Sequence, residues 1–336
     1  MKSVYKWAVS IFSGVTALVG LGILYQTLAE NKDKQRFPPP GNLFDIGGLR
    51  LHAICQGQGK PTVILEAGLS CTHLDWSRVI PAIAKNTQVF AYDRGGYGWS
   101  DPCLKPRTGL RMVGELHTLL KKAGVSAPYI LVGHSYGGLL VRLYASQYPE
   151  DVIGIILVDG SPEDQRKHFP QPKSVRERFS QEVQWQIFRL RPLLARIGII
   201  RLKKQPNGYI NPLPEEMKPI STAVGLQSRA YDWLWTEKPA IDATCEEVRN
   251  SVLPDHIQST VLTAGKSIQI EKNQNIWLRL QQELAQKMPN SAFEIVEGSG
   301  HYIHLEQPEK VIQVIFQMVD KVRCIDFQGG KEGVVR

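Results

Sequence analysis

The stretch Tyr129-Ile-Leu-Val-Gly-His-Ser-Tyr-Gly-Gly138 joins an apolar strand, a glycine-flanked serine and the start of a helix-forming segment. A serine hydroxyl is a weak nucleophile at neutral pH, and a sharp strand-to-helix turn is one way to present it to an activating base. Gly133, Gly137 and Gly138 permit such a turn, because a Cβ there would collide with neighbouring backbone. The pattern G-x-S-x-G is common by chance. Its place between a strand and a helix makes Ser135 a candidate nucleophile.

Length and composition are those of a globular enzyme. The chain has 336 residues, 43% of them hydrophobic and 21% charged, which suits one large domain with an insertion or two modest domains. The five cysteines are scattered without a C-x-x-C pair, and we expect small buried hydrophobes rather than a disulfide framework. No histidine accompanies them at metal-ligand spacing. We expect neither a metal nor an organic cofactor.

The first 30 residues predict a membrane anchor. No charged residue occurs from Ala8 to Tyr25, and this apolar segment is long enough to span a bilayer. Lys2 and Lys6 precede it, as in a secretory signal peptide, but the run exceeds a signal core and no A-x-A cleavage site follows. We therefore expect an uncleaved single span. Basic residues flank both of its ends, so the positive-inside rule does not choose an orientation.

Beyond the anchor, residues 31–41 are charged and proline-rich and predict an extended stalk. Apolar runs then alternate with helical patterns, as expected for a parallel sheet buried on both faces. The predicted strands cover 49–54, 61–65, 87–92, 129–132, 153–158, 260–264 and 292–296, and the predicted helices cover 76–85, 109–123, 138–148, 276–287 and 308–322. We expect a core of residues 42–160 and 257–324, followed by a tail at 325–336.

The alternation stops after Gly160, and we expect residues 161–256 to form an inserted helical cap. An apolar stripe recurs there at helical spacing, at Val183, Ile187, Leu190, Leu194, Ile197 and Ile200. We expect this stripe to pack in a hydrophobic core. The alternatives are a wall that faces the substrate and a face that rests on a membrane.

The basic charge of the chain is concentrated in the same segment. Residues 161–205 hold eleven Lys or Arg against four Asp or Glu, a net +7 of the total +8. No nucleic-acid motif accompanies this charge, so we do not expect nucleic acid as a partner. The basic surface either faces anionic lipid headgroups or is simply a solvated face.

Three further motifs follow predicted strands. Glu66-Ala-Gly-Leu-Ser-Cys-Thr-His-Leu-Asp-Trp76 follows strand 61–65, Tyr92-Asp-Arg-Gly-Gly-Tyr-Gly-Trp-Ser-Asp101 follows strand 87–92, and Gly298-Ser-Gly-His301 follows the last strand. With the serine turn, these motifs make residues 42–324 resemble the α/β-hydrolase fold family. The resemblance implies an α/β fold with a mostly parallel central sheet, helices on both faces and an inserted helical cap.

The resemblance also assigns roles at the site. It implies Ser135 as nucleophile and His301 as the base that takes its proton and returns it to the leaving group. The oxyanion hole would use the backbone amides of Tyr136 and Leu69, although the loop reads Glu-Ala-Gly-Leu and lacks the His-Gly of many relatives. We expect His134 and His304 to be structural, as we do Asp93, Arg94 and Asp101, whose motif normally braces loops around the pocket.

The acid of the triad has two candidates. The family's usual position, after strand 260–264, has no aspartate here, and the chain continues to Glu271. Some members carry the acid one strand earlier, where this chain has Asp159. We expect Asp159 to orient His301, with Glu271 as the alternative. The structural alternative for Asp159 is a turn cap.

Together these residues predict a membrane-anchored serine hydrolase that cleaves an ester or related acyl bond through an acyl-enzyme. Trp185, Trp233 and Trp235 in the cap indicate a small-molecule substrate with an apolar acyl or aromatic group. Two alternatives remain: an acyltransferase or cofactor-free haloperoxidase on the same triad, and a non-catalytic binding module. The resemblance disfavours haloalkane dehalogenases and epoxide hydrolases, which use aspartate where this chain has Ser135.

Overall fold

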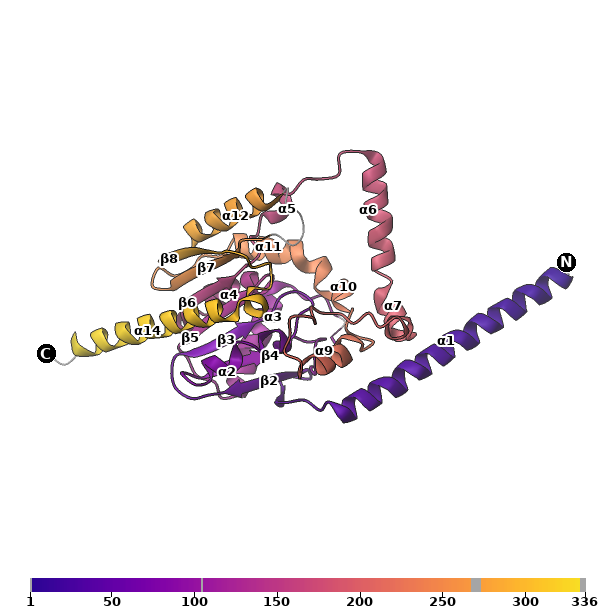
Figure 1. Cartoon of the computed structure of the whole chain (residues 1–336), viewed down its shortest axis with the longest axis horizontal. Coiled ribbons are helices and arrows are strands. Elements are labelled where there is room, and N and C mark those ends of the chain that lie inside the picture. The colour runs from indigo at the N-terminus through magenta and orange to yellow at the C-terminus, as the bar shows by residue number, and fades with distance from the viewer. Residues whose placement is uncertain (1, 104, 267–272, 333–336) are drawn as a thin grey trace.

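The computed structural model describes residues 2–103, 105–266 and 273–332. Its centre is an eight-stranded sheet ordered β1-β2-β4-β3-β5-β6-β7-β8 (Figure 1). The β1–β2 and β2–β4 pairs are antiparallel and the remaining pairs are parallel. The strands are β1 (Asn42–Asp45), β2 (Arg50–Gln56), β3 (Thr62–Glu66), β4 (Val89–Tyr92), β5 (Tyr129–His134), β6 (Val152–Val158), β7 (Gln258–Ala264) and β8 (Ser291–Val296). The predicted mostly parallel sheet is confirmed.

Helices cover both faces of the sheet, as predicted. One face carries α3 (Gly109–Lys122), α4 (Gly137–Gln147), α11 (Ile241–Arg249) and α12 (Gln274–Lys287). The other carries the 3-10 turn η1 (His73–Trp76) with α2 (Ile80–Ile83), α13 (Ile303–Glu306) and α14 (Pro308–Glu332). In β5, Leu131 packs with the first set, while Ile130 and Val132 pack with the second. Because alternate side chains of a strand point to opposite faces, burial on both sides produces the continuous apolar runs of the sequence.

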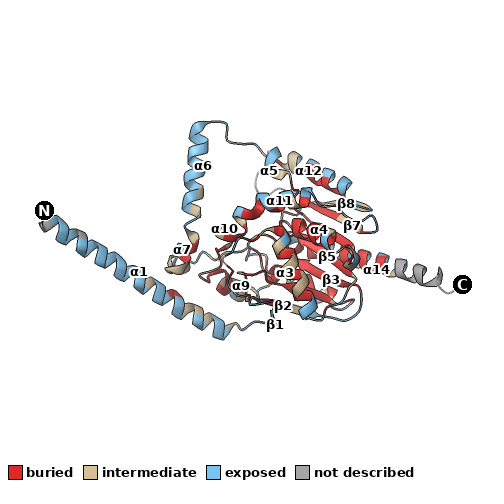
Figure 2. Cartoon of the chain, turned by 180° about the vertical axis from the view of Figure 1, so that it is seen from behind, coloured by how far each residue is buried: buried red, intermediate tan, exposed pale blue. Residues whose placement is uncertain are grey.

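Short helices fill the segment between β6 and α11. They are α5 (Gln165–His168), α6 (Val175–Phe188), α7 (Arg191–Arg196), α8 (Ile199–Leu202), α9 (Lys218–Gly225), α10 (Trp233–Thr236) and the 3-10 turn η3 (Lys238–Ala240); a further 3-10 turn, η2 (Pro149–Asp151), precedes β6. A small apolar cluster around Tyr231 and Leu234 holds several of them together. Helix α6 stands away from the body and is exposed along most of its length (Figure 2).

The predicted core role of the apolar stripe is wrong for its first half. Val183, Ile187 and Leu190 are 39%, 60% and 48% exposed, whereas Ile200 lies in the cap cluster and is 3% exposed. The reason is that α6 packs through its other apolar side, where Trp185 and Phe188 contact that cluster. The stripe therefore changes environment between α6 and α8.

The predicted stalk is also shorter than expected. Helix α1 (Lys2–Arg36) continues through the charged residues and ends before the Phe37-Pro-Pro-Pro40 segment. Charged residues such as lysine are good helix formers, whereas proline cannot donate the backbone hydrogen bond that a helix requires. An ion pair of 2.7 Å between Asp33 and Arg201 of α8 further holds the end of α1.

Helix α1 is long and apolar enough to cross a membrane. Its most apolar window has a mean hydropathy of 1.9 and is 0% buried within the chain. A signal sequence near an N-terminus meets the same criteria.

Two further differences concern short elements. Strand β1 was not among the predicted strands, and its four residues have no run of buried side chains. The predicted helix 76–85 is instead η1 followed by the four-residue α2. Thr72 and Asp75 form a reciprocal capping box that starts η1 upstream of the predicted boundary.

Candidate active site

Ser135 occupies the turn between β5 and α4, where its backbone φ is +51°. This left-handed conformation costs a non-glycine residue roughly 1–2 kcal/mol. A Cβ on Gly133 would stand 2.6 Å from the carbonyl oxygen of Gly137, and one on Gly137 would stand 2.5 Å from that of Glu66. The absence of these Cβ atoms lets β3, β5 and α4 approach closely, and the serine stands at the carboxyl edge of the sheet.

His301 and Asp159 meet at the same edge. Asp159 directly follows β6, and His301 stands in the turn between β8 and α13. The Nδ1 atom of His301 is 2.6 Å from Oδ2 of Asp159, and the aspartate side chain is 3% exposed against 31% for the histidine. Because a carboxylate accepts, the ring donates from Nδ1, and Nε2 is the nitrogen left to take a proton.

The other carboxylate oxygen of Asp159 accepts three hydrogen bonds. They come from the Thr263 hydroxyl (3.1 Å), the Ala264 amide (3.0 Å) and the indole Nε1 of Trp277 (2.9 Å). Thr263 and Ala264 end β7, while Trp277 comes from α12. Sequence reasoning missed these donors, because nothing in the sequence relates Trp277 to an aspartate so far away along the chain.

Ser135, Asp159 and His301 line one cavity of about 530 Å³. Trp277 and Phe169 line it as well, and their rings are stacked with centroids 6.3 Å apart. The structure thus brings the predicted nucleophile, base and acid to a single cavity. The alternative acid, Glu271, lies outside the described residues.

The loop after β3 approaches the serine turn closely. A Cβ on Gly68 would stand 3.3 Å from the Cβ of Ser135 and 2.9 Å from Nδ1 of His134. Leu69 follows Gly68, and Tyr136 follows Ser135, so both candidate oxyanion donors adjoin the serine. Within the described ranges, neither backbone N–H of this pair donates a hydrogen bond.

Comparison with known proteins agrees with this architecture. A family model described as the alpha/beta hydrolase family matches residues 63–314. The chain belongs to the alpha/beta hydrolase family. The uncharacterized protein YqjL of Bacillus subtilis is 36% identical over 117 residues, which cover 34% of this chain and 46% of that protein. The chain spans about half or less of the length of the first curated relatives it matches.

Solved structures show the same fold at low identity. A thermophilic esterase from Thermogutta terrifontis is 20% identical with a TM-score of 0.56, and the match covers 82% of this chain and 94% of the esterase. A Vigna radiata epoxide hydrolase is 15% identical with a TM-score of 0.64, and the match covers 83% of this chain and 98% of the other. Solved structures that share this fold therefore include enzymes of different hydrolytic reactions.

In this alpha/beta hydrolase, a buried arginine supports the loop after β3. The guanidinium of Arg94 donates to the carbonyl oxygens of Ala67 and Gly68, at 2.7 Å each. In a trans peptide the N–H points opposite to the C=O. Because Arg94 holds the Gly68 carbonyl, the N–H of Leu69 is directed to the side of the loop away from Arg94. The expected bracing role of Arg94 thus acts on the peptide of a candidate oxyanion donor.

Two buried glutamates form ion pairs with Arg94. Its guanidinium lies 2.6 Å from Glu66 of β3 and 3.0 Å from Glu237, which stands between α10 and η3. The hydroxyl of Tyr97 also donates to Glu237, at 2.9 Å. Burial raises the pKa of Glu66. Burial has the same tendency at Glu237, but the charges and hydrogen bonds of Arg94, Arg107 and Tyr97 together outweigh it and lower the pKa of that carboxyl. The network ties the segment after α10 to the candidate oxyanion loop.

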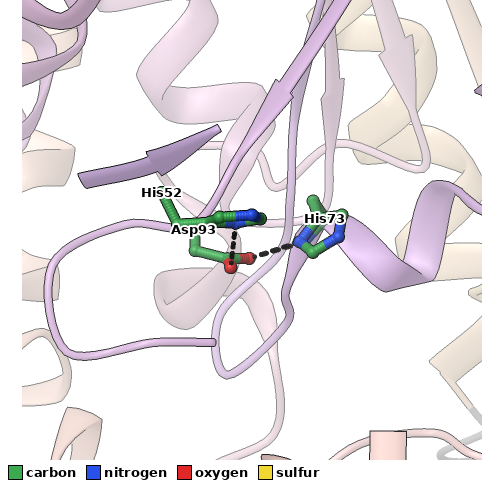
Figure 3. Close-up of side chains that lie close together, drawn as sticks. All are labelled: His52, His73 and Asp93. Atoms are coloured by element: carbon green, nitrogen blue, oxygen red, sulfur yellow. Dashed lines mark hydrogen bonds and ion pairs between the residues drawn. The ribbon is translucent and has the colours of Figure 1, made fainter. Parts of the chain in front are cut away.

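His52, His73 and Asp93 form a second buried polar cluster, and they offer three possible metal-ligand atoms within 4.8 Å of one another (Figure 3). Each imidazole Nδ1 is 2.9 Å from a different oxygen of Asp93. The backbone amides of His73 (2.9 Å) and Trp99 (3.2 Å) also donate to this carboxylate. Burial tends to raise the pKa of Asp93, but the two histidines lower it well below its usual value. All of these nitrogens donate to one carboxylate, so the cluster forms hydrogen bonds that hold β2, η1 and the turn after β4 together.

The remaining two histidines of the motifs are buried beside His301. Nε2 of His134 is 3.0 Å from the backbone oxygen of His301, and burial lowers the pKa of His134 well below its usual value. The ring of His304 packs on Trp76 with centroids 4.4 Å apart, and burial lowers its pKa to about 3. Both rings are therefore neutral at pH 7, and His301 is the most exposed histidine of the three.

Proposed function

We propose that the protein is a serine hydrolase that cleaves an ester or related acyl bond through a covalent acyl-enzyme. The observation that carries this proposal is the 2.6 Å contact of His301 Nδ1 with Asp159, beside Ser135 in one cavity. A nucleophile, a base and a group that orients the base are the parts that this chemistry needs.

In the first half-reaction, the Oγ atom of Ser135 attacks the acyl carbon and its proton passes to Nε2 of His301. Asp159 keeps the ring in the required tautomer and stabilises the imidazolium. His301 then returns the proton to the departing alcohol as the C–O bond breaks. In the second half-reaction, His301 takes a proton from water while the water oxygen attacks the acyl carbon. His301 then gives this proton to Oγ of Ser135 as the bond between Oγ and the acyl carbon breaks, and the acid leaves.

The oxyanion of each tetrahedral intermediate would be held by the backbone N–H groups of Leu69 and Tyr136. Their lack of partners among the described residues supports this role, because donors that are already oriented need no reorganisation during the reaction. Arg94 contributes as a positioning residue through the carbonyls of Ala67 and Gly68.

The substrate class follows from the cavity walls and the nucleophile. Phe169 and Trp277 offer aromatic surface for an apolar acyl or alcohol group. An epoxide hydrolase is less well supported, because Ser135 occupies the position at which that branch is expected to carry aspartate. Acyl transfer to an alcohol and cofactor-free haloperoxidase chemistry use the same residues, and a non-catalytic binding module uses none of them.

A fluorophosphonate probe tests the proposal in the full-length protein. We expect covalent labelling at Ser135, loss of labelling in Ser135→Ala, and turnover of short p-nitrophenyl esters by the unmodified protein only. Absence of labelling in a folded protein would favour the binding module. Release of acid in water, compared with transfer to added alcohols, separates hydrolase from acyltransferase.

We further propose that α1 is a retained membrane anchor. Its C-terminal part is built into the domain: Gln26 is 2% exposed and donates to the carbonyl of Leu226 at 2.8 Å, and Asp33 pairs with Arg201. A cleaved leader would remove these buried partners. Intact mass measurement and carbonate extraction of membranes test the proposal; a mature chain that begins after α1 would overturn it.

A further inference from the structure

Helix α6 carries an unusual row of solvent-exposed apolar side chains. Val175, Phe179 and Ile187 are 77%, 71% and 60% exposed, and Val183 between them is 39% exposed. Because the four residues are spaced four apart, they follow one side of the helix. None of the residues of α6 is buried.

The orientation of this row is set by the opposite side of the helix. Trp185 and Phe188 pack against the cap cluster, and their rings lie 5.9 Å apart. The centroid of the Phe188 ring is also 6.2 Å from that of Trp233. With this side occupied, the row of Val175, Phe179, Val183 and Ile187 faces outward, so α6 has one apolar side for the protein and another without a partner among the described residues.

Helix α7, which follows α6, places the C-terminal end of α6 near the emerging anchor. A Cβ on Gly22 of α1 would stand 2.4 Å from the carbonyl oxygen of Ile197, just after α7. The part of α1 before Gly22 extends free of the body, and α6 rises from α7 on the same side of the body (Figure 1). Residues 4–21 of α1 would measure about 27 Å, close to the ~30 Å hydrocarbon thickness of a bilayer. The membrane surface would then pass near Gly22, at the level of α7.

The segment around α7 and α8 also carries exposed apolar side chains and an excess of positive charge. Leu190, Leu193 and Leu202 are 48%, 49% and 65% exposed. From residue 173 to 204 the chain holds nine Lys or Arg and two Asp or Glu. Arg196 and Arg201 pair with Asp232 and Asp33 outside this range, which leaves a net charge of +5. Apolar residues flanked by basic ones are the composition of helices that lie in the interface of anionic membranes.

We propose that α6 lies in the headgroup region of the bilayer that α1 enters, with Val175, Phe179, Val183 and Ile187 directed at the acyl chains of anionic lipids. The proposal rests on the proposed retention of α1 as an anchor. It also deepens the proposed function, because α5 and the Phe169 wall of the active cavity directly precede α6. An apolar ester dissolved in the bilayer would then reach the cavity without crossing water.

Nitroxide labels in the full-length protein measure this directly. The background replaces the exposed Cys55 and Cys324 by serine, and single labels are placed by Phe179→Cys, by Gln181→Cys on the opposite side of α6, and by Phe12→Cys in α1. The protein is reconstituted in phosphatidylcholine vesicles with about 20% phosphatidylglycerol. We expect oxygen-accessible, membrane-buried labels at positions 12 and 179 and a water-accessible label at 181.

The other outcomes overturn the proposal in distinguishable ways. A buried label at 12 with a water-exposed label at 179 leaves the anchor and refutes the role of α6. A label at 179 that is immobile and shielded from both water and lipid means that protein covers the row, either a second copy or the closed cap. A water-exposed label at 12 refutes the anchor and the α6 proposal together. Fluorophosphonate labelling of Ser135 in the same samples reports the proposed chemistry independently of all three.

Activity gives a second readout. The double variant Phe179→Ser with Ile187→Ser should lower kcat/KM about tenfold for an ester embedded in these vesicles, since it removes apolar contacts with the bilayer. Hydrolysis of a soluble short-chain ester should stay within about twofold, because neither residue lines the active cavity. The matched control Gln181→Ser should change neither. Equal losses on both substrates would refute the membrane role.

Discussion

Asp159→Asn tests the proposed site most sharply, because the surroundings of the carboxylate allow the amide only one orientation. One oxygen of Asp159 accepts from Thr263, Ala264 and Trp277, so the amide oxygen must take that position. The amide NH2 group then faces Nδ1 of His301, which can accept its hydrogen bond only by moving the ring proton to Nε2. In that tautomer Nε2 can no longer take the proton of the serine.

The expected loss is large and specific to the chemical step. A forced change of tautomer lowers kcat about 10⁴-fold in Ser-His-Asp proteases. At about 1.36 kcal/mol per tenfold change, this raises the barrier by about 5.4 kcal/mol. Asp159→Asn keeps the size of the side chain and its three hydrogen bonds on one oxygen. We therefore expect little change in KM or in the unfolding midpoint.

The assay is steady-state hydrolysis of a p-nitrophenyl ester together with the rate of fluorophosphonate labelling at Ser135. Glu271→Gln is the matched control, and we expect it to stay within about threefold of the unmodified protein. The reasoning is refuted if Asp159→Asn retains more than a tenth of the activity while folded. A loss of several orders of magnitude in Glu271→Gln alone would instead identify Glu271 as the acid.

Three further predictions follow from individual contacts. Trp277→Phe removes one hydrogen bond to the Asp159 carboxylate and should lower kcat at least about tenfold with an altered pH profile, since a hydrogen bond to a charged group contributes about 1.5–3 kcal/mol. An unchanged kcat and profile would exclude this positioning role. Gly137→Ala should lower the free energy of unfolding by more than 2 kcal/mol, because its Cβ would meet a backbone oxygen at 2.5 Å. Gly114→Ala in α3, where no atom lies within 4 Å of the added Cβ, should raise the free energy of unfolding by about 1 kcal/mol. Urea unfolding compares the two variants. The pKa of His304 is about 3 in the folded protein and near 6.5 in the unfolded chain. The unfolded chain therefore binds more protons below pH 6.5, and the free energy of unfolding decreases as the pH is lowered. Lowering the pH from 6.5 to 5 should reduce the free energy of unfolding by about 2 kcal/mol through the His304 imidazole. In urea titrations, His304→Leu should lack this part of the pH dependence, and an unchanged pH dependence would contradict the prediction.

The sheet was predictable because its signals are local. Strands such as β3 and β6 are buried on both faces, and this burial requires the unbroken apolar runs that the sequence shows. Strand β1 escaped prediction because it packs no such run. The prediction of a stalk was wrong for residues 31–36, which belong to α1. Charged residues there are compatible with a stalk or a helix, and the ion pair of Asp33 with Arg201 favours the helix.

The site was predictable only where a motif carries it. Ser135 and His301 stand in turns whose glycines are visible in the sequence, whereas the choice between Asp159 and Glu271 was open because either position follows a strand. The contact that supports Asp159, its 2.6 Å approach to His301, depends on how strands far apart in sequence are ordered in the sheet. The pairing of Arg94 with Glu66 and Glu237 could not be predicted for the same reason, because these residues are far apart in sequence.

The order of the strands explains how an acid after β6 can serve a histidine that follows β8. Strand β7 lies between them in the sheet, and its end is where the family usually places the acid. In this chain the last two residues of β7 donate the Thr263 hydroxyl and the Ala264 amide to Asp159. These donors fix the carboxylate while its free oxygen meets the imidazole of His301 above the end of β7. An acid after β6, as proposed for Asp159, would therefore keep the orientation of the base, because the end of β7 supports its carboxylate.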